Sequence, residues 1–301
     1  MTFAAVLLVI FSAFTHAGWN MFSKSQSPSA GFFLLASWGT VFWFAPVFFL
    51  TRELLPIIPA GIWIKLLFAG FFQAVYYVGL AGAYRKGALS IAYPLARSFP
   101  LFFLVLLACL TGQGRDFSVV GLTGLGAIVG GAFILPMNSF RDFRLANYCN
   151  PSCALALVAA VGTAGYSFVD DMAMNAIKIL PDASADWARA VLYLVLESAL
   201  TALWLHVLLL FGKNSRAQFR KDSKRLFKPA FQAGLAIGVT YGLVLLAMTQ
   251  ATNVSYVVGL RQLSIPIGTF LGIVVLKEKG SRPRYIGAGL LFLGLLLIIL
   301  E

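Results

Sequence analysis

Residues 87–110 read GALSIAYPLARSFPLFFLVLLACL, and this stretch decides what kind of fold the chain adopts. It is long and apolar enough to cross the ~30 Å hydrocarbon core of a bilayer as a helix. It nevertheless contains Arg97, with Pro94 and Pro100 on either side. Arginine is costly inside a membrane and almost always faces the interior of a helix bundle, where prolines are also tolerated. We therefore expect this segment to be a charged inner wall of a helical membrane protein.

The composition extends this expectation to the whole chain. Of the 301 residues, 60% are hydrophobic and 11% are charged, whereas a soluble domain carries about 25% charged residues. No alternation of period two recurs, which disfavours a β-barrel. No basic segment precedes the first apolar run, so we expect no cleaved signal peptide. The predicted fold class is an all-α integral membrane protein with ten transmembrane helices.

The ten expected spans are separated by short joints that are rich in charge, glycine or proline. They cover residues 2–22, 31–50, 61–84, 87–110, 117–136, 152–177, 188–211, 228–250, 254–276 and 283–300.

The basic residues indicate the orientation of these spans. Of the 23 lysines and arginines, 16 fall in loops that follow odd-numbered spans and 5 on the other side. Since basic loops stay in the cytoplasm, we expect both termini outside and a cytoplasmic basic loop at 212–228, in an inner (plasma) membrane. The net charge of +12 then reflects topology, and no nucleic-acid partner is expected.

An internal repeat divides the chain. FTHAGWNMFSK (14–24) aligns with VGTAGYSFVDD (161–171), and the opening stretch aligns with residues 252–276, so that Arg261 corresponds to Arg97 and Pro266 to Pro100. We expect a first five-helix repeat at 1–136, a cytoplasmic linker at 137–151 and a second repeat at 152–301. Because five is odd, the halves have opposite orientations, which is typical of secondary transporters with a substrate site near the midplane.

HAGWN (16–20) in the first span and AYPLARSFPLF (92–102) in the fourth resemble the EamA-type branch of the drug/metabolite transporter superfamily. The resemblance covers nearly the whole chain. It implies a central cavity lined by spans one to four and six to nine, with spans five and ten at the periphery. It also implies export or exchange of small organic metabolites, amino acids being frequent. Many members carry their basic loop after the second span, whereas here it follows the seventh.

Two arginines are candidates for binding an anionic group of the substrate. Arg97 and Arg261 could hold a carboxylate, phosphonate or phosphate through paired hydrogen bonds. The alternatives are a structural ion pair for Arg97 and snorkelling to the interface for Arg261. Aromatic rings with polar tips would complete a wall suited to small amphipathic solutes. The other substrate-binding candidates are Trp19, Asn20, Tyr77, Tyr93, Tyr166 and Tyr241.

Four further ionisable residues fall inside expected spans. Glu197 could carry a coupling proton, bind a substrate amine or simply pair with an arginine. His16 could relay protons or be a structural group. Asp170 and Asp171 are adjacent and cannot share one helix face, so that at most one faces the interior. We expect Pro94, Pro100 and Pro266 to break their helices, and the glycine pair Gly126 and Gly130 to mediate packing or dimerisation.

The motifs expected of other classes of protein are missing from the sequence. It has no HExxH, GxSxG or Walker motif and no selectivity filter, so that an enzyme or a channel is disfavoured. Cys109, Cys149 and Cys153 match no metal spacing, and we expect no metal and no cofactor. The sequence thus predicts a secondary transporter of small metabolites that acts as a monomer or homodimer. A flippase for a lipid-linked intermediate and a drug exporter remain alternatives.

Overall fold

The structure is a computed structural model in which every regular element of the described residues is helical. It describes residues 2–26, 28–86, 96–97, 99–100, 103, 110, 118–134, 137, 139–142, 150–178, 185–211, 213–251, 254–267 and 281–299. No strand occurs among these residues, which confirms the all-α prediction.

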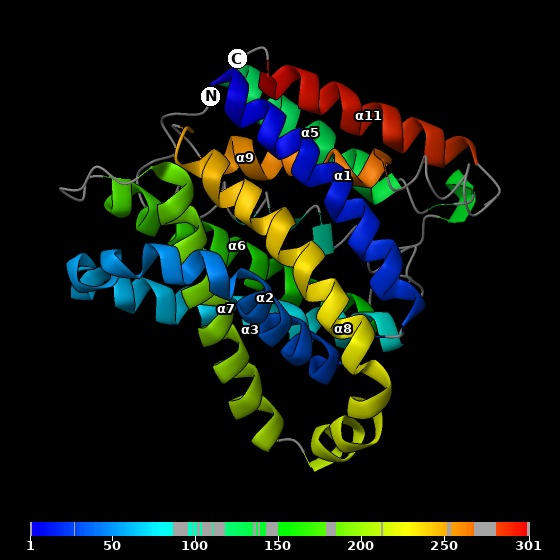
Figure 1. The fold of residues 1–301 in the computed structure, drawn as a ribbon. Coiled ribbons are helices and arrows are strands. Elements are labelled where there is room, and N and C mark those ends of the chain that lie inside the picture. Colours follow the sequence, from blue (N-terminus) through cyan, green and yellow to red (C-terminus); the bar gives the residue numbers. More distant parts are fainter. Residues whose placement is uncertain are drawn as a thin grey trace.

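Figure 1 shows the order of the helices along the chain. They are α1 (Phe3–Ser25), α2 (Ala30–Thr51), α3 (Ala60–Lys86), α5 (Val119–Ile134), α6 (Pro151–Lys178), α7 (Asp186–Phe211), α8 (Lys213–Met248), α9 (Val254–Arg261) and α11 (Arg282–Ile299), with 3-10 turns η1 (Arg52–Ile57) and η3 (Phe140–Asp142).

Six of these helices are long and apolar enough to cross a membrane, which is consistent with a membrane protein. They are α1, α2, α3, α6, α7 and α8, the counterparts of expected spans one to three and six to eight. The apolar part of α5, Val119–Gly131, is shorter. Most of the expected fourth span, 87–110, and the second half of the ninth lie outside the described residues. The count of ten spans therefore stays a prediction.

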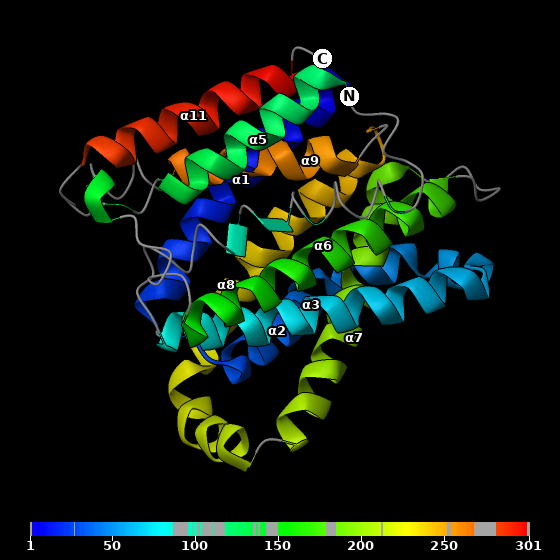
Figure 2. The same cartoon turned by 180° about the vertical axis from the view of Figure 1, so that it is seen from behind.

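The helices pack in pairs, and glycines set the closest approaches. α3 lies along α6, α1 along α8, and α5 along α11, as both views show (Figures 1 and 2). A Cβ on Gly162 of α6 would lie only 2.5 Å from the backbone nitrogen of Tyr76 in α3. Small residues of this kind let two backbones touch, which is how helices associate inside a membrane.

The glycines that mediate the α5–α11 contact differ from the expected pair. A Cβ on Gly126 or Gly130 would have no neighbour within 4 Å among the described residues, so the expected role of this pair in packing or dimerisation stays a prediction. The contact instead uses Gly131, which faces the carbonyl of Gly287, and Gly294, which faces the carbonyl of Gly124. The glycines of the α5–α11 contact therefore lie on the same helix as the expected pair but at different positions.

The stretch expected as a basic cytoplasmic loop at 212–228 is helical, because residues 213–228 are the first part of helix α8. This corrects its secondary structure, while its cytoplasmic side stays a prediction. The reason for the helical form is tertiary packing. A Cβ on Gly31 of α2 would collide with the ring of Phe219, and Leu226 is buried. The stretch therefore has an apolar side that packs on the bundle, while basic side chains such as Arg220 and Lys224 stay exposed.

Candidate functional site

Asp170 of α6 is held in the interior by hydrogen bonds to both of its carboxyl oxygens. It is completely buried. Tyr193 of α7 donates its hydroxyl to Asp170 Oδ1 at 2.8 Å, and Tyr241 of α8 donates to Oδ2. Hydrogen bonds to a carboxylate favour its ionised form and are stronger than neutral ones. One carboxylate thus joins three helices in the middle of the bundle.

Glu197 lies one helical turn beyond Tyr193 on α7 and has the opposite environment. Its side chain is buried, and neither carboxyl oxygen accepts or donates a hydrogen bond in the part of the chain that the structure describes. Asp170 and Arg261 are close enough to act on it electrostatically. Glu197 is therefore a buried acid with both oxygens available.

Arg261 is the last residue of α9 and points into the same region. It is buried, and its guanidinium carbon lies 5.7 Å from the centre of the Tyr241 ring, a cation–π distance. Residues 262–263 form a turn before residues 264–267 are helical again. Pro266 explains this interruption, because a proline ring clashes with the carbonyl four residues earlier, here that of Gln262. The interruption ends α9 at Arg261.

His16 links α1 to the two arginines. Both Arg97 and Arg261 are close enough to act on its ring electrostatically, and Arg97 is itself buried. Trp19 Nε1 donates to His16 Nδ1 at 3.1 Å, and Asn20 Nδ2 donates to the His16 carbonyl at 2.9 Å. A neutral ring that accepts at Nδ1 carries its proton on Nε2. That atom is buried and has no partner among the described residues.

Aromatic rings connect these groups across the bundle. Tyr77 of α3 stacks on Phe33 of α2, with centroids 4.5 Å apart and planes inclined by 9°. Tyr76 meets Tyr166 of α6 at 6.0 Å, and Tyr166 meets Tyr241 edge-on at 5.6 Å. The rings form a continuous wall from α2 to α8, with the hydroxyl of Tyr241 at Asp170.

Several buried side chains on these helices have hydrogen-bonding atoms without a partner in the described part of the chain. Buried polar side chains normally have partners, yet several here have none within the described ranges. They are His16 Nε2, Gln73 Oε1, Thr163 Oγ1, Ser167 Oγ, both oxygens of Glu197, Thr201 Oγ1 and Ser264 Oγ. They come from α1, α3, α6, α7 and the helical residues 264–267 that follow α9. Together with the charged residues above they form what we call the interior site, which can offer hydrogen bonds to a polar solute.

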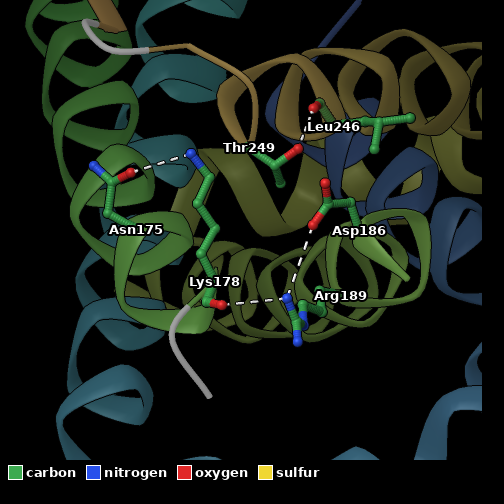
Figure 3. A network of polar contacts seen from close by, with 6 residues as sticks. All are labelled: Asn175, Lys178, Asp186, Arg189, Leu246 and Thr249. Atoms are coloured by element: carbon green, nitrogen blue, oxygen red, sulfur yellow. Dashed lines mark hydrogen bonds and ion pairs between the residues drawn. The ribbon is translucent and has the colours of Figure 1, made fainter. Parts of the chain in front are cut away.

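Asp171 does not belong to the interior site, although Asp170 does. It interacts with Asn175 and Lys178 near the end of α6. Figure 3 shows the polar network at this end of the bundle, where Lys178 Nζ donates to Asn175 at 3.5 Å and Arg189 donates to the Lys178 carbonyl at 3.3 Å. Arg189 also pairs with Asp186 at 3.8 Å. The two adjacent aspartates therefore lie in different environments, Asp170 in the interior and Asp171 near the end of α6.

The remaining candidates are only partly covered. Tyr93 and Pro94 lie outside the described residues. Pro100 is described and buried. Tyr193 and Gln73 were not predicted as site residues, although Tyr193 is four residues before Glu197 and so shares its helix face. That spacing was the available signal for Tyr193.

Comparison with known proteins supports the fold but names no function. No protein-family model matches the sequence, and no curated protein matches it either. In structure, 26 solved chains resemble it. One of them, a crystal structure described only as that of a protein, superposes with a TM-score of 0.71 at 16% identity, over 100% of this chain and 98% of the other. At this identity the likeness establishes a shared fold alone.

Proposed function

We propose that the protein is a secondary active transporter that moves a small organic solute bearing a carboxylate, phosphonate or phosphate across a membrane. One observation carries the proposal. Two buried arginines, two buried carboxylates and a set of unused polar atoms meet an aromatic wall inside a bundle whose helices are long enough to span a bilayer. Burying such groups is expensive. A polar solute that forms hydrogen bonds or ion pairs with these groups would offset the free-energy cost of burying them.

Helix packing supports alternating access between two inverted halves. If α1, α2, α3 and α5 correspond to α6, α7, α8 and α11, then the α3–α6 contact has the α1–α8 contact as its counterpart. The α2–α8 contact likewise corresponds to α3–α7, while α2–α7 and α5–α11 pair with themselves. A pseudo-two-fold axis would give this pattern. Inverted repeats of this kind rock around a fixed site.

The EamA-type resemblance supports the same class of protein. HAGWN contributes His16, Trp19 and Asn20, which are joined by hydrogen bonds on α1. The interrupted segment at Arg261 is the expected counterpart of the PLARSFP motif. These features favour export or exchange, driven by an ion gradient or a counter-substrate.

Contacts between helix ends support a single basic side of the bundle. Ser152 Oγ at the start of α6 donates to the Ala83 carbonyl at 2.8 Å, just before Arg85 and Lys86. The start of α8 packs on the start of α2 through Phe219. We propose that this basic side faces the cytoplasm, with both termini outside.

Counterflow in proteoliposomes tests the proposal. Vesicles preloaded with one unlabelled solute from a panel of amino acids, phosphonates and sugar phosphates should accumulate that solute in labelled form. Arg261→Gln should abolish this accumulation, because it removes a cation of the interior site. Arg189→Gln, at the end of the bundle, is the matched control and should retain it.

The alternative outcomes separate the candidate classes. Absence of counterflow for every member of the panel, with protein that remains folded, would contradict the proposal. Movement of a lipid-linked sugar between leaflets in the same vesicles would then favour the flippase. Accumulation of only hydrophobic cationic drugs would favour a drug exporter.

A further inference from the structure

The two carboxylates of the interior site are held in opposite ways. Asp170 accepts one tyrosine hydroxyl on each oxygen, from Tyr193 and Tyr241. Glu197 is 2% exposed, and its two oxygens have no hydrogen-bond partner among the described residues. Tyr193 and Glu197 lie on the same face of α7, yet the hydroxyl of Tyr193 donates to Asp170 and not to Glu197. The two carboxylates therefore differ in their hydrogen bonds.

A buried carboxylate is costly in its ionised form unless hydrogen bonds or a cation compensate it. Asp170 has two hydroxyl donors, with Arg261 close enough to act on it as well. Glu197 shares the same arginine with Asp170 but has no hydrogen-bond donor among the described residues. When two acids compete for one region in this way, the less well compensated one takes the proton.

We infer that Glu197 is the proton-binding group of the interior site and that Asp170 is its fixed anion. In the binding step one proton from water adds to one oxygen of Glu197, and no other bond changes. The assignment of the proton rests on the two environments above. That this proton is coupled to transport rests in addition on the proposed function.

Titratable or charged groups from several helices lie close enough to interact electrostatically with Glu197. They are Tyr77 of α3, Asp170 of α6, Tyr193 of α7 itself, Tyr241 of α8 and Arg261 at the end of α9. Helix α2 also packs on α7 but carries no ionisable side chain. Of the groups named, Asp170 opposes ionisation of Glu197 because like charges repel, and Arg261 favours it. Asp170 already shares Arg261 and thereby weakens its effect on Glu197.

Charge balance links this proton to the solute. Protonation of Glu197 removes one negative charge from the neighbourhood of Arg261 and so strengthens the attraction of the interior site for an anionic group of a solute. Ionisation of Glu197 restores that negative charge and weakens the attraction. By linkage, a proton that strengthens binding of an anion is itself bound more tightly when the anion is present.

Infrared difference spectroscopy of the purified wild-type protein tests the proton assignment without any solute. The probe is the proton alone, and the signal is the carbonyl stretch of a protonated carboxyl group that appears as the pH is lowered. Growth on ¹³C-labelled glutamate should shift the band to lower frequency, whereas ¹³C-labelled aspartate should leave it in place. This comparison needs no substitution and so cannot fail through misfolding.

Variants then assign the band to one residue. Glu197→Gln should lose it, while Asp170→Asn and the matched control Asp171→Asn should keep a band from a protonated glutamate. A band that moves with labelled aspartate, that survives in Glu197→Gln, or that is missing over the whole pH range in the wild type would overturn the inference. A glutamate band in a protein that shows no counterflow would uphold the proton site and reject the proposed transport.

Discussion

At the scale of single residues, the interior is organised by which groups share a helix face. Asp170 and Asp171 are neighbours in sequence, yet the first is tied to Tyr193 and Tyr241 and the second interacts with Lys178 at the helix end. The sequence alone predicts that they must diverge, because successive residues lie 100° apart on a helix. It does not predict which one turns inward, since that depends on how α6 is rotated against α7 and α8.

Arg97 gives the sharpest residue-scale prediction. Arg97→Lys keeps the charge but loses the planar fork that holds two oxygens at once. Losing one charge-assisted hydrogen bond costs roughly 1.5–3 kcal/mol, which is roughly a 10- to 100-fold weaker affinity. The measurement is the dissociation constant of a solute that passes the counterflow test. Arg189→Lys is the control and should leave the dissociation constant unchanged. An unchanged dissociation constant in Arg97→Lys would instead indicate that Arg97 has only a structural role between helices.

At the scale of helices, glycines and prolines decide where elements touch and where they stop. Pro266 accounts for the interruption after Arg261, and this effect follows from the sequence alone. The helical form of residues 213–228 does not follow from the sequence alone, because the seven basic residues in this stretch favour a solvent-exposed loop. It depends on Phe219 meeting Gly31 of α2 nearly 190 residues away, a contact that no local pattern reveals.

The α3–α6 contact gives the prediction at this scale. Gly162→Ala would place a methyl group 2.5 Å from the backbone nitrogen of Tyr76, so that the two helices must move apart. We expect a loss of about 1–3 kcal/mol of stability, the usual cost of overpacking. Thermal unfolding in detergent measures it. Gly18→Ala adds the same methyl group on α1 with no atom of the described residues within 4 Å, and it should be neutral or slightly stabilising. Equal melting curves for the two variants would contradict the close contact.

At the scale of the whole molecule, composition and periodicity are enough to predict an all-α protein with long apolar helices. Six such helices fall where six of the expected spans were placed. The candidate site is less predictable. His16, Glu197 and Arg261 stand out as costly residues in apolar segments, whereas Tyr193 and Gln73 look like ordinary packing residues. Their roles arise only when α3, α6 and α7 meet.

Access to the interior from both sides of the membrane is the most direct test of alternating access. Ser167, completely buried one turn before Asp170, can be replaced by cysteine in a chain whose Cys109, Cys149 and Cys153 are changed to alanine. A membrane-impermeant thiol reagent should label this cysteine when added to either side of sealed vesicles, and label from one side should block label from the other. Asp186→Cys, at the bundle end where the Asp186 side chain is 44% accessible, should react from one side only. Labelling of the Ser167 position from a single side, or from neither, would contradict alternating access to the interior site.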